Sequence, residues 1–405
     1  MTQEQTARPD SMELFNPFAD GFIDDPYSTY HKLRAYEPLH FHTGMNMWLM
    51  TRYRDIDEML RTNDLGRGEQ MRFFGNFEAG SAIDLVSRSW LFGMDPPDHT
   101  RVRRLFAKAF TPRRIARLRP YIEAKVDELL DQFAADGGGD FIEKVAQLLP
   151  VAVICHLLGI PDADHAVCKQ HSSAVVPLLD PVITEEQLEK AEAGSAWFLE
   201  YFDHHIESRR RDPQDDLVSA LLAATEDGQK LAKHELMNNV IFLFGAGHET
   251  TTSTLGNGLA ALLLNPEQYD LLRKDLSLLS NAVLEMLRWD SPVQYIGRRV
   301  MVDNLVVDGV ELERDQVVMG LLGAGNRDPE QFADPDRFDI TRPEIQPLSF
   351  GAGIHYCLGA ALSRLETEIV FEKLITRFPR LSMDGVPPRK GLFAVRSYTE
   401  LVLEV

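Results

Sequence analysis

The segment that most constrains the fold of this chain is HELMNNVIFLFGAGHETTTSTLGNGLAALLLNPEQ, which begins at His234. No proline interrupts it before Asn265-Pro266, so it predicts one central helix over residues 234–265, about 45 Å long at the usual helical rise. Its residues are apolar on most faces, which is typical of a helix that crosses a core rather than one that lies on a surface. We therefore expect this helix to run through the interior of the protein.

The remainder of the chain carries mostly helical patterns and a few strand patterns. Apolar residues recur at helical spacing in IEAKVDELLDQFAAD and in the segment from EEQLEK to SRRRD, and turn residues follow both. Strand-like stretches are confined to residues 40–55, 293–325 and 390–405, the second with an Asp-Gly turn. We therefore expect a single, mainly α domain over residues 1–405, with a small β-rich region and a disordered segment at 1–12.

Charge and cysteine content exclude several classes of protein. Asp and Glu number 62 against 42 Lys and Arg, and the net charge of −20 disfavours binding to nucleic acid or anionic membranes. The N-terminus lacks a signal-peptide pattern, and no stretch is apolar for long enough to span a bilayer. The 3 cysteines form no CxxC pair, so no disulfide framework is expected. These features predict a cytoplasmic protein with reduced thiols.

The stretch LSFGAGIHYCLG at residues 348–359 contains a cysteine in an unusual setting. A single free cysteine is most often a small buried hydrophobe. Here Gly351 and Gly353 allow a bulky group to approach the backbone, and the pattern after Cys357 predicts a helix. The free N–H groups and partial positive charge of a helix N-terminus favour a thiolate. One thiolate without a nearby second ligand does not suit structural zinc, but it suits the axial position of a haem.

This stretch resembles the FGxGxHxCxG signature of the cytochrome P-450 superfamily, the haem-thiolate monooxygenases. The matching residues are Phe350, Gly351, Gly353, His355, Cys357 and Gly359. The resemblance implies the P-450 fold, a triangular helical domain whose long central helix lies over the haem. It also implies that 348–359 is the haem-thiolate loop and that Cys357 binds the iron of haem b. Contacts to the cofactor are implied for Phe350, Gly351, His355 and Gly359, with no bound flavin or nicotinamide.

The middle of the long helix, FGAGHETTTS, combines small residues with an acid and hydroxyls. Alone, such a segment is most often a helix kink whose threonines bond back to carbonyls. It also resembles the oxygen-binding groove of the same superfamily. That resemblance implies that Ala246 and Gly247 lie against the cofactor. It also implies that Thr250 contacts dioxygen and that Glu249 helps to deliver protons.

Two further motifs occur in the order of the family. Glu285 and Arg288 are an ordinary i,i+3 ion pair by themselves, but they resemble the ExxR motif, which implies a buried network with Arg337. His99 and Arg103 lie four apart in a basic helix that could equally be a solvated face. They resemble the HxxxR motif that contacts the haem propionates, and Arg299 resembles a further propionate ligand.

Basic residues cluster in one segment of this acidic chain: Arg101, Arg103, Arg104, Lys108, Arg113, Arg114, Arg117 and Arg119. Such a patch can steer an acidic partner, although a solvated face is the simpler interpretation. In the family this helix lies near the thiolate. The resemblance therefore implies a monomer that receives electrons from an acidic ferredoxin and its ferredoxin reductase, with docking at Arg104, Lys108 and Arg113.

The substrate is the least constrained feature of the sequence. The resemblance implies a mostly apolar and aromatic pocket, although any one of its residues could be plain core. The expected residues are Phe73, Phe74, Phe77, Leu243, Phe244, Val293, Ile296, Phe393 and Val395. We expect hydroxylation or epoxidation of a hydrophobic natural product of the polyketide or macrolide type. The alternatives are a terpenoid, steroid or fatty-acid substrate, a peroxygenase or oxidative coupling enzyme, and a haem sensor without catalysis.

Overall fold

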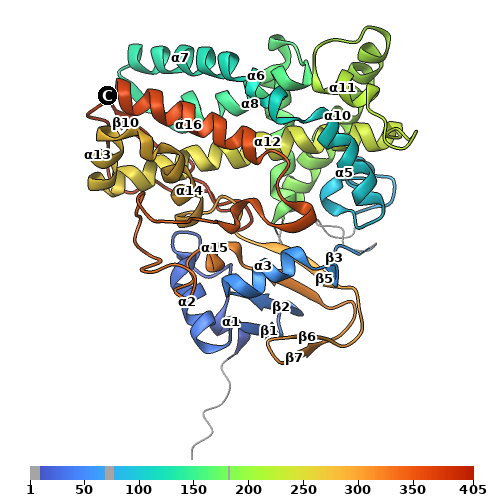
Figure 1. Cartoon of the computed structure of the whole chain (residues 1–405), viewed down its shortest axis with the longest axis vertical. Helices are drawn as coiled ribbons and strands as arrows, with labels where there is room; N and C mark the ends of the chain where they lie inside the picture. Colours follow the sequence, from blue (N-terminus) through green and yellow to red (C-terminus); the bar gives the residue numbers. More distant parts are fainter. Residues whose placement is uncertain (1–9, 69–76, 181–182) are drawn as a thin grey trace, which may run out of the picture.

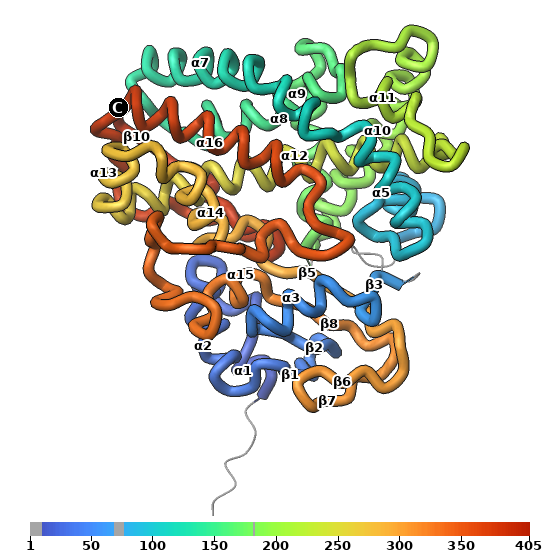
Figure 2. The backbone as a smooth tube through the Cα atoms, viewed as in Figure 1, coloured from blue at the N-terminus to red at the C-terminus, as the bar shows by residue number. Residues whose placement is uncertain are grey.

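The computed structural model describes residues 10–68, 77–180 and 183–405. Helices make up one part of the molecule, and the N-terminal helices with the largest sheet make up the other (Figure 1). The long helix α12 (Lys233–Leu264) runs through the helical part and contacts α16 (Ala360–Arg377). It ends before Pro266, which begins α13, and it agrees with the predicted helix to within one residue at each end. Figure 2 shows the same arrangement as a tube.

The other helices vary widely in length. The α-helices are α1 (Ser11–Leu14), α2 (Pro26–Tyr36), α3 (Tyr53–Arg61), α4 (Ala82–Ser87), α5 (Asp98–Ala109), α6 (Pro112–Arg117), α7 (Arg119–Ala135), α8 (Leu148–Leu158), α9 (His165–Val175), α10 (Glu185–Arg211), α11 (Leu217–Ala223), α13 (Pro266–Lys274), α14 (Leu279–Trp289) and α15 (Leu322–Gly325). The shorter turns are η1 (Leu91–Gly93), η2 (Ile142–Ala146), η3 (Asp162–Asp164), η4 (Val176–Leu179), η5 (Leu276–Leu278), η6 (Leu348–Phe350) and η7 (Gly353–His355).

The strands form three small sheets in the described residues. The strands are β1 (Leu39–His42), β2 (Met47–Met50), β3 (Leu65–Gly66), β4 (Gly138–Asp140), β5 (Ile296–Val300), β6 (Leu305–Val307), β7 (Val310–Leu312), β8 (Val317–Gly320), β9 (Ser382–Met383) and β10 (Val402–Glu404). The largest sheet has the order β1-β2-β8-β5-β3, in which β2 and β8 are parallel. The predicted Asp-Gly turn joins β6 to β7, with positive φ at Asp308 and Gly309. A third sheet pairs β10 with β4 and β9.

Three sequence predictions about element boundaries were too broad. The first β-rich stretch ends at Met50, and the predicted stretch 390–405 contains only β10 and two isolated bridges, Val293–Val395 and Arg389–Tyr398. The predicted disordered segment 1–12 lies mostly outside the described residues, but Ser11 already begins α1 because the Asp10 side chain caps it. Propensity alone does not show these limits, because tertiary contacts decide where short elements stop.

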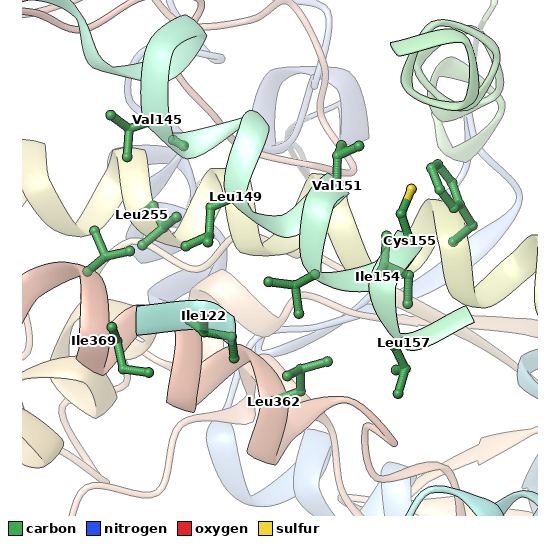
Figure 3. Packing of buried hydrophobic residues seen from close by; sticks show 14 of the residues in the cluster. Ile122, Val145, Leu149, Val151, Ile154, Cys155, Leu157, Leu255, Leu362 and Ile369 are labelled. Carbon is green, nitrogen blue, oxygen red and sulfur yellow. The ribbon is translucent and has the colours of Figure 1, made fainter. Parts of the chain in front are cut away.

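Helices from distant parts of the chain share the main core. Figure 3 shows Leu149 and Ile154 of α8 packed with Leu255 of α12 and Leu362 and Ile369 of α16. Two smaller clusters lie under the main sheet and between the N-terminal helices. The central helix is therefore enclosed on several sides, as its all-round apolar sequence predicted. Among the described residues, none of the helices is both long enough and apolar enough to span a bilayer.

Candidate functional site

The loop around Cys357 is folded tightly before the first turn of α16. The backbone N–H of Cys357 donates to the carbonyl of Phe350 at 2.9 Å. Gly353 has φ +65°, and a Cβ at this position would lie 2.4 Å from the carbonyl oxygen of Leu60 in α3. Only glycine combines the left-handed backbone with this close approach. Gly353 therefore fixes the path of the loop against α3.

Opposing effects act on the pKa of the Cys357 thiol. Its side chain is accessible, yet desolvation by the surrounding protein raises its pKa. The backbone N–H groups of Gly359 and Ala360 and the cation of Arg103 act in the opposite direction and lower the pKa. A metal cation at the sulfur would supply the positive charge that tips this balance to thiolate. These donors therefore fit a thiolate ligand.

Cationic side chains from four separate segments meet beside this loop. The rings of His99 in α5 and His355 in η7 lie 4.3 Å apart, and Arg103 donates to the carbonyl of Tyr356 at 2.7 Å. Desolvation lowers the pKa of His99 to about 4 and that of His355 to about 2, with nearby Arg67 and Arg298 adding to both shifts. We call Arg67, His99, Arg103, Arg298 and His355 the cationic cluster. Its positive charge comes from the three arginines, because the lowered pKa values leave the two histidines neutral at pH 7.

Asp95 is an acid beside the cationic cluster that acts on His99, Arg67 and Arg298. Both carboxylate oxygens of Asp95 accept from the backbone N–H of Arg67 at 2.9 Å. Within residues 10–68, 77–180 and 183–405, both ring nitrogens of His99 and Nη2 of Arg298 are buried without a hydrogen-bond partner. Buried polar atoms normally have partners. Donors of this kind fit the two carboxylates of a haem.

Arg298, the neighbour of the predicted Arg299, lies with the cationic cluster. Arg298 is buried, and desolvation lowers its pKa to about 10. Arg299 instead donates to the carbonyl of Asp315 at 3.1 Å and pairs with that carboxylate at 3.6 Å. Successive residues of a strand point to opposite faces, so only one of the two neighbours in β5 can join the cationic cluster. Arg299, whose Nε is also buried without a hydrogen-bond partner in the described residues, stays a prediction, but the charge that acts on His99 and His355 is that of Arg298.

The hydroxyl-rich turn of α12 has an orderly pattern of bonds. Thr250 donates to the carbonyl of Ala246 at 2.9 Å, and Thr251 donates to that of Gly247 at 3.0 Å. Thr251 also meets Ser363 of α16 at 3.3 Å. The hydroxyl of Thr250 has thus used its proton and can accept a further hydrogen bond. The bonding back to carbonyls that the sequence allowed is present, and it leaves Thr250 able to act as an acceptor.

Glu249 is buried among basic groups. Its Oε1 accepts from Nζ of Lys390 at 2.7 Å, and its Oε2 lies 3.5 Å from Nε2 of His248. Burial raises the pKa of Glu249, but Lys390, His248 and Lys169 lower it, and the net shift is downward. The acid is therefore held as a carboxylate in the interior.

The glycines of this turn face neighbouring helices rather than the side of Ala246 and Thr250. A Cβ at Gly245 would lie 3.5 Å from Ser172 of α9, and one at Gly247 would lie 3.5 Å from Ile154 of α8. The predicted cofactor contact of Gly247 is therefore not supported by its orientation. Ala246 and Thr250 are half-buried and share one face, because they are four residues apart on a helix.

The Glu285–Arg288 pair is fully buried, with two N–H···O bonds of 2.7 Å. Arg288 also donates to the carbonyls of Asn326, Pro335 and Arg337. The predicted third partner was wrong, because the Arg337 side chain is 65% exposed and only its carbonyl reaches the pair. Arg342, whose Nε lies 3.5 Å from Glu285, is the second cation of this network.

The predicted substrate residues fall into several groups. Phe73 and Phe74 lie outside the described residues. Phe244 is buried against Phe198 of α10, and Phe393 packs in the N-terminal cluster and stacks on Tyr295 at 4.7 Å. Both are core residues, because Phe244 is 0% exposed and Phe393 is 5% exposed.

The other pocket candidates differ in exposure. Phe77, Leu243 and Val293 are half-buried, whereas Ile296 and Val395 are buried. Leu243 shares a helix stripe with Ala246 and Thr250, which are three and seven residues further on. These half-buried apolar residues are the ones that a small molecule could contact.

Ion pairs partly neutralise the positive charge of the surface that is predicted to bind the ferredoxin. Arg104 and Lys108 both pair with Glu226, while Arg114 and Arg117 pair with Asp215. Arg113 is exposed and has no ion pair within the described part of the chain. Ile354 and Tyr356 of the cysteine loop are exposed apolar residues near Arg103.

Sequence reasoning missed four residues of the site. Arg67 is fully buried, its guanidinium lies 4.2 Å from the ring centre of Phe92, and it donates to Gly297. Asp95, Lys390 and Arg342 were also missed. No local pattern marks them, since each one acts through a contact with a distant part of the chain. Strand alternation could have favoured Arg298 if the register of β5 had been known.

Comparisons with known proteins agree with this geometry. The family model described as Cytochrome P450 matches residues 43–394. Cytochrome P450 107B1 of Saccharopolyspora erythraea is 39% identical over 91% of this chain and 92% of its own length. The cytochrome P450 monooxygenase PikC of Streptomyces venezuelae is 37% identical over 95% of this chain and 91% of its own.

Two further similar proteins extend the comparison. The mycinamicin IV hydroxylase/epoxidase of Micromonospora griseorubida is 38% identical over 85% of each chain. A solved structure of P450BioI, in complex with an acyl carrier protein that bears hexadec-9Z-enoic acid, has a TM-score of 0.90 and 33% identity over 95% of this chain and 98% of its own. The activity is that of a P450 monooxygenase related to hydroxylases of secondary metabolism, and the family implies a haem-thiolate iron. The chain belongs to the cytochrome P450 family.

Proposed function

We propose that this chain binds haem b through Cys357 and hydroxylates or epoxidises a hydrophobic natural product of the polyketide or macrolide type. The observation that carries the proposal is the cationic cluster beside the cysteine loop, with its unpartnered atoms on His99 and Arg298. A group that carries two carboxylates and a metal would bind both the cationic cluster and the Cys357 thiolate. The propionates would be held by His99, Arg103, Arg298 and His355, and the iron by the Cys357 thiolate.

The residues around the iron would hold the cofactor in place. The N–H groups of Gly359 and Ala360 stabilise negative charge on the sulfur. Phe350 and Gly351 would form the adjacent wall, since a Cβ at Gly351 would meet nothing within 4 Å. When bound, the haem reduces dioxygen and transfers one of its oxygen atoms to the substrate.

Thr250 and Glu249 would supply the proton chemistry. The hydroxyl of Thr250 donates to the carbonyl of Ala246. Its free lone pair can therefore accept a hydrogen bond from a protonated oxygen of a bound ligand. Glu249 is a buried carboxylate one residue away, and it can take up and release a proton. An acid and a hydroxyl at adjacent positions support activation of dioxygen rather than obligate use of peroxide.

The substrate assignment is supported by the relatives and by half-buried apolar residues. One relative is named a mycinamicin IV hydroxylase/epoxidase. Leu243, Val293 and Phe77 present half-buried apolar surface, which suits a hydrophobic molecule. Polar groups that would fix the position of oxygen insertion are not among these three residues. We therefore propose the substrate class without its regiochemistry.

The electrons would come from an acidic ferredoxin and its reductase. Arg104, Lys108 and Arg113 lie on the segment next to the cysteine loop, and Arg113 has no competing ion pair in the described residues. Exposed Ile354 and Tyr356 add apolar contact area at the same place. A mixed surface of this kind suits transient association of a monomer with an acidic partner.

Incorporation of labelled oxygen tests the proposed reaction. The haem-loaded protein would be supplied with a bacterial ferredoxin, its reductase and NADPH, and mycinamicin IV would serve as the probe. The proposal predicts a product that carries one oxygen-18 atom from labelled dioxygen and none from labelled water. Product formed with hydrogen peroxide, but none with dioxygen and reductant, would establish a peroxygenase instead.

A further inference from the structure

The contact between Glu249 and Lys390 joins two segments that are far apart in the sequence. Nζ of Lys390 donates to Oε1 of Glu249 at 2.7 Å across a separation of 141 residues. The glutamate side chain is 10% exposed and the lysine side chain 25% exposed. The lysine therefore extends from the buried acid to the edge of the protein.

Lys390 is held by its surroundings rather than being a free surface side chain. Its backbone N–H donates to the carbonyl of Ser397 at 2.9 Å. The preceding residue, Arg389, donates to Asn257 at 3.0 Å and to Asp290 at 2.6 Å. Asn257 lies on α12 two turns beyond Glu249. Residues 389–398, which we call the C-terminal hairpin because Arg389 and Tyr398 form an antiparallel bridge, are therefore bound to α12 at two points. The ammonium group is thereby preorganised against the acid.

Two other basic groups face Glu249, and neither can replace Lys390. Lys169 of α9 acts at a distance and is shared with Glu143, and desolvation lowers its pKa. Nδ1 of His248 lies 3.2 Å from the carbonyl of Phe244, and Nε2, which lies 3.5 Å from Glu249, forms no hydrogen bond within the described residues. Desolvation also lowers the pKa of His248. Lys390 is thus the cation in direct contact with the acid.

We propose that Lys390 is the positioning residue of proton delivery, which keeps Glu249 ionised and fixes the position of its carboxylate. This inference rests on the proposed role of Glu249. A buried carboxylate without a partner would be protonated at neutral pH and could not accept a proton from water. Contact with Lys390 leaves the acid charged, and the partly exposed lysine gives solvent a route to it. Glu249 can then take a proton from water and pass it toward Thr250.

Infrared titration of the haem-loaded protein tests this role directly. The carbonyl band of protonated Glu249 is identified by its absence in Glu249→Gln. In Lys390→Met the midpoint of this band should rise by about one to three pH units, the usual effect of losing an adjacent opposite charge. Lys390→Arg should restore the wild-type midpoint, because it restores the positive charge.

The matched control is Lys190→Met. Lys190 pairs with Glu186 at the same distance, 2.7 Å, but both side chains are exposed. This variant should leave the Glu249 midpoint unchanged. Thermal unfolding of each variant shows that it is folded, and Lys390→Gln provides a second neutral substitution.

Two results would count against different parts of the account. A Glu249 midpoint that stays at its wild-type value in both Lys390→Met and Lys390→Gln would overturn the role of the lysine. That result would leave the haem-thiolate assignment intact, since the reduced carbon monoxide spectrum reports on Cys357 alone. A wild-type protein without a thiolate-type spectrum would contradict the proposed function instead.

Discussion

The imidazole rings of His99 and His355 lie 4.3 Å apart, although one belongs to α5 and the other to the loop before α16. Both are surrounded by arginines, and the pKa of each is lowered far enough to leave the rings neutral at pH 7 without an added anion. An anion placed between these groups would gain several charge-assisted hydrogen bonds. The histidine pair therefore brings α5 and the cysteine loop together at a place that fits an anion.

Substitutions in β5 distinguish the roles of Arg298 and Arg299. Arg298→Ala should weaken haem retention about tenfold or more, because it removes a buried donor from the cationic cluster. Arg299→Ala should have little effect, since Arg299 bonds to Asp315. Haem transfer to apomyoglobin measures the difference, and Arg298→Lys shows whether charge alone suffices. Equal haem loss from both alanine variants would contradict the assignment.

Removal of Glu285 should strongly destabilise the fold. Glu285→Ala leaves Arg288 buried and unpaired, and we expect a loss of about 3–5 kcal/mol in the free energy of unfolding. Arg337→Ala should cost less than about 1 kcal/mol, because its side chain is largely exposed. Urea unfolding of the two variants distinguishes these positions. A comparable loss of unfolding free energy in Arg337→Ala would show that the Arg337 side chain is a partner of Glu285 and Arg288 after all.

The protonation of Asp180 should make stability depend on pH. Asp180 accepts from the N–H groups of Phe393 and Ala394, and desolvation raises its pKa from 3.8 to about 6. A carboxyl with a raised pKa favours folding when protonated, so stability falls as pH rises from about 4 to about 6 and is constant above that. The free energy of unfolding of Asp180→Asn does not fall in this way. Its advantage over wild type should therefore grow by about 1 kcal/mol from about pH 5 to pH 8. A difference in unfolding free energy that does not change with pH would rule this out.

Loss of the Thr250 hydroxyl should uncouple turnover. Thr250→Ala should keep haem and substrate binding, while product yield per NADPH falls roughly 10–100-fold and peroxide increases. Thr250→Ser retains the hydroxyl and should recover most of the yield. Peroxide assays during NADPH oxidation measure both variants. A fully coupled alanine variant would exclude Thr250 from proton delivery.

Much of the fold could be predicted from local sequence. The limits of α12 follow from continuous apolarity and from Pro266, which cannot continue a helix. The β6–β7 turn follows from Asp308-Gly309, where both residues have positive φ. These features depend on neighbouring residues, so one sequence is enough to show them.

The composition of the site could be predicted only in part. The motifs located Cys357, His99 and Glu285, but the choice between Arg298 and Arg299 depends on the register of β5. The choice between Arg337 and Arg342 depends on which side chain of a loop turns inward. Lys390 reaches Glu249 through the placement of the C-terminal hairpin, which no local pattern encodes.

The central claim is that Cys357 binds haem iron as a thiolate. The most direct measurement is the visible spectrum of the purified, reduced protein after addition of carbon monoxide. The account predicts a strongly red-shifted Soret band, which Cys357→Ala abolishes and Arg299→Ala leaves in place. A band at the position of a haem with a neutral ligand, or a purified protein that binds no haem, would contradict it.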